Sequence, residues 1–347
     1  RGIPYIYDID DNLLALTESS KLGRDLRRSG ALQCLEKYLK GAALARVYSR
    51  PMLQQVVALG ARAQLVVPPV DWSVIAPFHE GRKSDRVKIV YATSRMEDEL
   101  AELFVPALVD LLREYGDRIE VFFFGSKPAS PSGRNVHFSP FTPNYDRFMG
   151  KFSRGGFDIG LAPLQDDLFH RSKTNNKFRE YGACRIAGIY SNVDVYSECV
   201  KDGETGLLVP NEKAAWYCAM KRLIDDEDLR NKIRTQGYDA AKSAYSYEQF
   251  LDVWSRQLEE VMENAGIQAG TAALRTDADA RRTPEPSFLI ARFKWFRSGM
   301  GKALRYAMSG NLGMMKTGLR WVWITLWMHC FTAKLRVVGW WASRRRS

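Results

Sequence analysis

Two lysines and a glutamate fall at helical spacing within residues 173–181. Lys173, Lys177 and Glu180 are separated by four and then three residues, which places them on one face if the segment is a helix. An apolar run at residues 186–190 follows and predicts a buried parallel strand. Two cations and a carboxylate beside such a strand suit a sugar nucleotide, because the cations can meet a diphosphate and the carboxylate can accept from ribose hydroxyls. The alternative is a solvated helix face with one Lys–Glu pair, which is common.

Acidic side chains follow the first apolar run of the chain, residues 3–9. Asp10, Asp11 and Asn12 come directly after it, and the carboxyl ends of strands face the ligand crevice in open α/β sheets. In one interpretation these residues only cap the next helix. In a second, Asp8 and Asp10 resemble the nucleophile motif of haloacid-dehalogenase-like phosphatases, with Asn12 where threonine is usual.

A longer segment, residues 173–209, resembles the donor-binding signature of GT-B glycosyltransferases, in particular the large retaining family four. The matching positions are Lys173, Lys177, Glu180, Tyr181, Gly182, Tyr196, Val200, Asp202, Gly203 and residues 206–209. The resemblance implies that Glu180 binds the donor ribose and that the two lysines bind the diphosphate. The family has a second glutamate eight positions before Glu180, where this chain has Ser172. Either one donor contact is altered, or Lys173 replaces it.

Three shorter stretches support the same resemblance. Residues 7–11 resemble an element near the end of the N-terminal domain of polysaccharide glycosyltransferases, which implies that Asp10 faces the donor sugar at the catalytic centre. Residues 67–71 resemble the crossing out of that domain, and residues 157–164 a strand and loop of the second domain. We assign no catalytic base.

A loop with anion-binding character follows the predicted strand 87–92. Ser94 and Arg95 stand where an α/β fold places a phosphate-binding turn, before the start of a helix. We expect both to contact the donor phosphates. Arg95 as an ordinary surface residue is the alternative.

The alternation of predicted strands and helices indicates an α/β fold of the GT-B type, with two Rossmann-like domains and parallel sheets. We expect a partial N-terminal acceptor domain at 1–80, its early strands absent from this chain. A nucleotide-sugar donor domain at 81–245 and a crossing helix at 246–264 follow. A flexible linker is expected at 265–287 and a basic, Trp-rich helical tail at 288–347.

The positive charge of the chain is concentrated at its end. The net charge is +11, and residues 281–347 contain 14 Lys and Arg against a single acid, Glu285. The basic balance therefore does not indicate nucleic-acid binding by the rest of the chain. The tail suits association with an anionic membrane surface. Five cysteines without paired spacing indicate reduced thiols in the cytoplasm.

These observations predict a cytoplasmic glycosyltransferase, in part peripheral on the inner face of a bacterial cell membrane. It would transfer a sugar, by resemblance a hexose with retention of configuration, from a nucleotide-sugar to a cell-envelope polysaccharide, O-antigen or capsule acceptor, polymeric or lipid-linked. No metal or other cofactor is expected, because lysines and Arg95 can neutralise the leaving diphosphate. The alternatives are a non-catalytic GT-B-like scaffold module and, with less support, the phosphatase.

Overall fold

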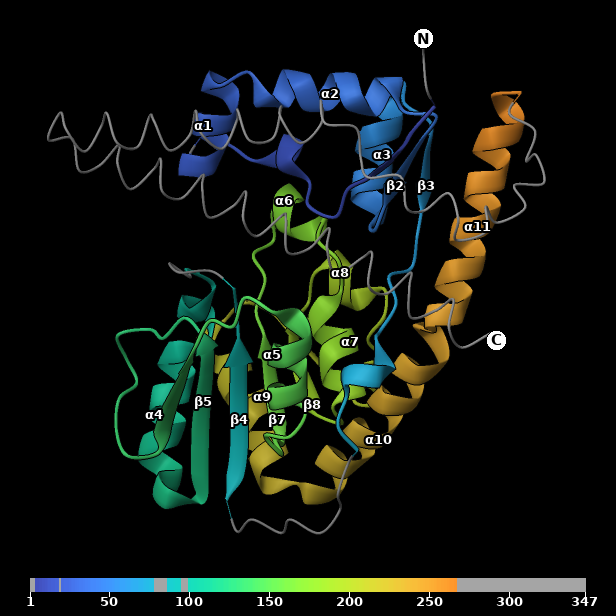
Figure 1. Cartoon of the computed structure of the whole chain (residues 1–347). Helices are drawn as coiled ribbons and strands as arrows, with labels where there is room; N and C mark the ends of the chain where they lie inside the picture. Colours follow the sequence, from blue (N-terminus) through green and yellow to red (C-terminus); the bar gives the residue numbers. More distant parts are fainter. Residues whose placement is uncertain (1–3, 19, 78–85, 95–98, 267–347) are drawn as a thin grey trace, which may run out of the picture. The chain divides into compact units, whose positions relative to one another are not determined.

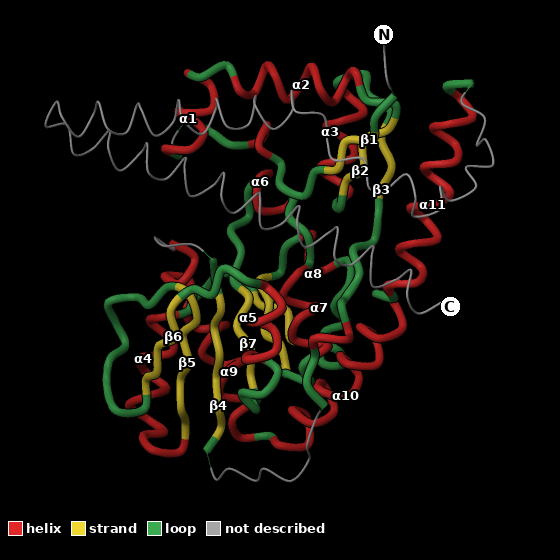
Figure 2. The backbone as a smooth tube through the Cα atoms, in the orientation of Figure 1, coloured by secondary structure: helices red, strands yellow, loops and turns green. Residues whose placement is uncertain are grey.

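The computed structural model describes residues 4–18, 20–77, 86–94 and 99–266. The predicted linker and tail fall outside these ranges, apart from residues 265 and 266. The described residues contain two parallel sheets with helices packed against them (Figures 1 and 2). The prediction of an α/β fold with parallel sheets is therefore confirmed.

The first sheet has three strands in the order β1-β2-β3. They are β1 (Ile6–Asp8), β2 (Leu44–Val47) and β3 (Ala63–Leu65), with Tyr7 paired to Ala45 and Ala45 to Ala63. Its helices are α1 (Lys21–Arg28), α2 (Ala31–Gly41) and α3 (Arg50–Ala58). The apolar faces of α2 and α3 pack on the sheet around the buried side chains of Leu39, Val47 and Met52, and α1 contacts α2.

The second sheet has six strands in the order β6-β5-β4-β7-β8-β9. The strands are β4 (Val87–Ala92), β5 (Ile119–Gly125), β6 (Val136–Pro140), β7 (Ile159–Ala162), β8 (Ala187–Ser191) and β9 (Leu207–Val209). The helices are α4 (Val105–Tyr115), α5 (Tyr145–Phe152), α6 (Leu168–Arg171), α7 (Asn176–Ala183), α8 (Asp194–Ser197), α9 (Lys213–Asp225) and α10 (Glu227–Ala244).

Both faces of this second sheet are covered. Along β4, Ile89 and Tyr91 pack into one core with α4 and α9, and Val90 and Ala92 pack into another with α5, α7 and α10. A parallel strand buried on both faces reads as a continuous apolar run, and this is why the sequence predicts β4 with the bounds that the structure has.

The last described helix, α11 (Tyr247–Asn264), lies beside the first sheet (Figure 1). Gln257 Nε2 donates to Gln64 Oε1 at 2.7 Å, and the Arg46 guanidinium lies 4.0 Å from the centre of the Trp254 ring. Among the described helices, none combines the length and apolar character needed to cross a bilayer. The described cysteines are free thiols.

Candidate functional site

A cavity of about 450 Å³ opens at the carboxyl ends of β4, β5 and β7. Its floor is formed by the residues that follow these strands, including Ser94, Gly125 and Pro163, and one wall by the loop 140–143 after β6. Ligands of open α/β sheets bind at this edge. We call this cavity the donor pocket.

The donor pocket brings together nearly all of the side chains predicted from the sequence. Its lining includes Asp10, Asp11, Ser94, Lys173, Lys177 and Glu180. The remaining predicted residue, Arg95, lies outside the described residues. His170, in α6, is not part of this lining.

Glu180 is the most enclosed acid of the donor pocket. Its residue is 7% exposed, Lys177 Nζ donates to its Oε2 at 2.6 Å, and Tyr145 Oη donates to its Oε1 at 3.2 Å. Burial, reinforced by the charge of Glu180, raises the pKa of Tyr145 well above its ordinary value. The Glu180 carboxyl group therefore accepts from two donors and is part of the lining of the donor pocket.

Tyr145 was not predicted from the sequence as a site residue. It is the first residue of α5 and follows a short loop that contains Pro143. Its position at the carboxyl end of β6 is the signal that could have identified it, because that edge forms the ligand crevice. Its partner Glu180 comes from a different helix, α7, so the pair itself has no local signature.

Lys173 does not belong to the helix that carries Lys177 and Glu180. Helix α7 begins at Asn176, so the prediction that three residues share one helix face is wrong for Lys173. The reason is tertiary, because Asn175, directly before the helix, donates from its Nδ2 to the hydroxyl of Tyr245 at 2.6 Å. Lys173 reaches the donor pocket from the preceding loop, where its Nζ lies 2.7 Å from Asp11 Oδ1.

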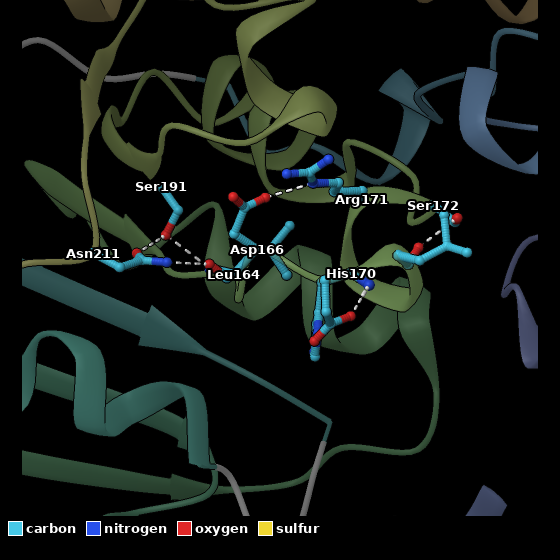
Figure 3. A network of polar contacts seen from close by, with 9 residues as sticks. Leu164, Asp166, His170, Arg171, Ser172, Ser191 and Asn211 are labelled. Atoms are coloured by element: carbon cyan, nitrogen blue, oxygen red, sulfur yellow. Dashed lines mark hydrogen bonds and ion pairs between the residues drawn. The ribbon is translucent and has the colours of Figure 1, made fainter. Parts of the chain in front are cut away.

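Ser172, which stands where the resembling family has glutamate, is fully buried. Its Oγ donates to the Leu168 carbonyl at 2.6 Å (Figure 3). The same oxygen accepts from Asn12 Nδ2 at 2.9 Å. Its carbonyl accepts from Ser49 Oγ at 2.8 Å. Ser172 is not in the lining of the donor pocket, so in the described structure its side chain is engaged with the protein.

The loop between β7 and α7 is held in place by hydrogen bonds at both ends. Ser191 Oγ accepts from Leu164 N at 2.9 Å and donates to Asn211 Oδ1 at 2.6 Å (Figure 3). At the other end Arg171 Nε donates to Asp166 at 2.5 Å, and this bond lowers the pKa of the Asp166 carboxyl. These bonds fix the conformation of the loop that leads to Lys173.

Gly125 allows the floor of the donor pocket to close. It has φ +88°, and a Cβ there would lie 1.8 Å from the carbonyl oxygen of Thr93. Thr93 N bonds to the Phe124 carbonyl at 2.9 Å. Only glycine fits this close approach between the ends of β4 and β5.

The structure does not support the phosphatase interpretation. Asp8, its nucleophile, lies 3.3 Å from the Arg46 guanidinium and is not in the lining of the donor pocket. Within the described ranges, no three His, Cys, Asp or Glu side chains lie close enough together to hold a metal ion.

Comparisons with known proteins identify the fold. No model of a protein family matches the sequence, and no curated protein matches it significantly. Among solved structures, the chain is similar to sucrose-phosphate synthase of Thermosynechococcus elongatus, with a TM-score of 0.58, 15% identity and coverage of 75% of this chain and 68% of that one. It is also similar to Anabaena HepE, solved with UDP and glucose, with a TM-score of 0.55, 14% identity and coverage of 74% and 71%. The structure of TarM matches with a TM-score of 0.52 at 10% identity, covering 73% of this chain and 50% of that one. The chain therefore has the GT-B fold, as predicted.

Proposed function

We propose that this chain is a glycosyltransferase that binds a nucleotide-sugar in the donor pocket. The observation that carries the proposal is the convergence of Lys173, Lys177 and Glu180 on one cavity at the carboxyl ends of the second sheet. The likeness in fold to HepE, a protein solved with UDP and with UDP-glucose, supports a nucleotide-sugar as the ligand.

The lysines would neutralise the diphosphate. An ammonium group has three donors, so Lys177 can keep its bond to Glu180 and still donate to a phosphate oxygen. Lys173 is paired with Asp11, and Asp11 is half-exposed, so the pair can open or be shared when a phosphate arrives. Two such cations can stabilise a leaving diphosphate without a metal ion. Ser94 and Arg95, in the loop after β4, are proposed as further phosphate contacts.

Glu180 would accept hydrogen bonds from the ribose hydroxyls. Its two oxygens are oriented by Lys177 and Tyr145, and a carboxylate held by two donors is preorganised for further bonds. Asp10, exposed and in the lining of the same cavity, would face the sugar and the acceptor. We propose a hexosyl donor, retention of configuration and a relationship to family four, on the sequence resemblance described above.

The acceptor proposed is a cell-envelope glycan, polymeric or lipid-linked, and the basic tail at 288–347 is proposed to contact an anionic membrane surface. The same resemblance supports the proposed boundaries of an acceptor domain at 1–80 and a donor domain at 81–245.

Release of UDP from UDP-sugars, with and without glycan acceptors, tests this function. Lys177→Met should lower the rate at least tenfold, because it removes a charge-assisted bond of about 1.5–3 kcal/mol. The matched control is Lys213→Met, which breaks an ion pair of 2.5 Å outside the donor pocket and should not change the rate. Equal rates for the two variants would contradict the proposed site.

One observation favours a second candidate, a GT-B-like module that binds the donor without transferring it. Ser172 replaces the family's glutamate and is buried, so one donor contact is missing on that side. Tight binding of a nucleotide-sugar together with no transfer to any acceptor would support this module over the transferase.

A further inference from the structure

A two-residue segment before α7, Ser172 and Lys173, is hydrogen-bonded to residues next to elements of the first sheet. Asn12, after β1, and Ser49, before α3, both bond to Ser172. Asp11 pairs with Lys173. These contacts join residues more than 120 positions apart. Two of them hold Ser172, the residue directly before Lys173, and the third holds Lys173 in the donor-pocket lining.

The Ser49 hydroxyl bonds to Ser172 and does not cap helix α3. It occupies the position before α3, where a serine usually accepts from the first backbone N–H groups of the helix. No such side-chain bond is present at Ser49. Its hydroxyl instead donates to the Ser172 carbonyl at 2.8 Å, so removing it would leave the capping of α3 as it is.

Asn12 is placed in the same way. It is 1% exposed, and its amide nitrogen donates to Gln55 Oε1 at 2.7 Å and to Ser172 Oγ at 2.9 Å. Ser172 Oγ already donates to Leu168, so it can only accept from Asn12. In the part of the chain that the structure describes, Asn12 Oδ1 has no hydrogen-bond partner, which costs stability. An apolar side chain at position 12 would avoid that cost. The presence of an amide there is therefore explained by its bonds to Gln55 and Ser172.

We propose that Asn12 and Ser49 are positioning residues, which hold the backbone and side chain of Ser172 so that Lys173 points into the donor pocket. The proposal rests on the proposed function, because it assigns Lys173 to the donor diphosphate. Through these bonds the first sheet sets the affinity for the donor without touching it. The resembling family has a glutamate at position 172 that contacts the nucleotide-sugar. In this chain the serine at that position instead holds the neighbouring Lys173 in place.

A double-mutant cycle tests whether Asn12 acts through Lys173. Binding is measured by isothermal titration calorimetry with whichever of UDP, GDP, ADP and TDP the wild-type chain binds most tightly. Lys173→Met should weaken binding roughly 10- to 100-fold, the value of a charge-assisted bond. Asn12→Ala and Ser49→Ala should each weaken it about fivefold, since they loosen the lysine without removing it. In the Lys173→Met background, Asn12→Ala should cause no further loss beyond about twofold.

The outcomes separate this inference from the proposed function. The positioning role would be overturned, with the donor pocket left in place, by either of two results. In the first, the affinity losses of Asn12→Ala and Lys173→Met add in the double variant. In the second, Asn12→Ala and Ser49→Ala bind the nucleotide like wild type. If wild type binds no nucleotide, the proposed function fails and the inference falls with it. Tyr115→Phe is the control, because it removes a 2.7 Å bond to Asp225 outside the pocket and should leave binding unchanged. If Asn12→Ala does not fold, Ser49→Ala carries the same cycle.

Discussion

Replacing Glu180 by glutamine should affect a nucleoside and its diphosphate differently. The substitution keeps the size of the side chain and one acceptor oxygen for Tyr145 or the ribose, but it removes the negative charge beside Lys177. In the wild type that charge attracts Lys177 and repels an incoming diphosphate. Glu180→Gln therefore weakens the ribose contact and strengthens the attraction between Lys177 and the phosphates.

The two effects are of similar size. Hydrogen bonds to a charged acceptor are worth about 1.5–3 kcal/mol and those to a neutral one about 0.5–1.5 kcal/mol, so the ribose contact loses about 1 kcal/mol. A carboxylate and a phosphate about 8 Å apart repel each other by roughly 2 kcal/mol at an effective dielectric constant near 20, and by less beside solvent. Removing this repulsion returns about 1 kcal/mol to a diphosphate ligand. We therefore expect uridine to bind about fivefold more weakly and UDP to bind within about twofold of wild type.

Calorimetric titration with UDP and ligand-observed NMR titration with uridine measure both affinities. Glu114→Gln is the matched control, since its ion pair with Lys221 at 2.5 Å lies outside the donor pocket. A loss of UDP affinity as large as the loss of uridine affinity would refute the placing of Lys177 between Glu180 and the phosphates.

Three further predictions concern the floor of the pocket, a buried thiol and the chain crossing. Gly125→Ala should lower the free energy of unfolding by about 2–3 kcal/mol, the upper part of the range for overpacking, because the added Cβ would collide with Thr93. It should also abolish nucleotide binding. Urea unfolding measures the first effect and calorimetric titration the second. Burial raises the pKa of Cys199 to about 11, so roughly 0.1% is thiolate at pH 8, and iodoacetamide should modify exposed Cys34 first. Arg179→Met should lower the free energy of unfolding by about 1–3 kcal/mol, because it leaves the Pro69 carbonyl without its 2.7 Å bond.

Local patterns in the sequence are sufficient for most of the second sheet. The bounds of β4 match those expected, because a continuous apolar run decides them. The GT-B fold also follows, since the donor-site pattern and the strand–helix alternation agree with each other. Of the residues that line the donor pocket, Asp10, Asp11 and Ser94 were predicted because they follow strands at one edge of a sheet, and Lys173, Lys177 and Glu180 because of their spacing and the resemblance.

The parts that the sequence could not predict depend on contacts between distant segments. The start of α7 is decided by the bond between Asn175 and Tyr245, 70 positions away, so Lys173 appeared to belong to the helix. The bond from Tyr145 to Glu180 joins two helices, and the burial of Ser172 depends on Asn12. Helical periodicity carries no information on such pairs.

Binding of nucleotide-sugars to the unmodified chain tests the central claim most directly. Thermal unfolding is followed with UDP-, GDP-, ADP- and TDP-sugars, for wild type beside Lys177→Ala and Glu180→Ala. We expect one nucleotide class to stabilise the wild type by about 2.7 kcal/mol at a concentration of 100 times its Kd, a rise of roughly 5–10 °C. Both variants should show a clearly smaller rise at the same concentration. No rise with any of the four classes at millimolar concentration would contradict a donor site in this pocket.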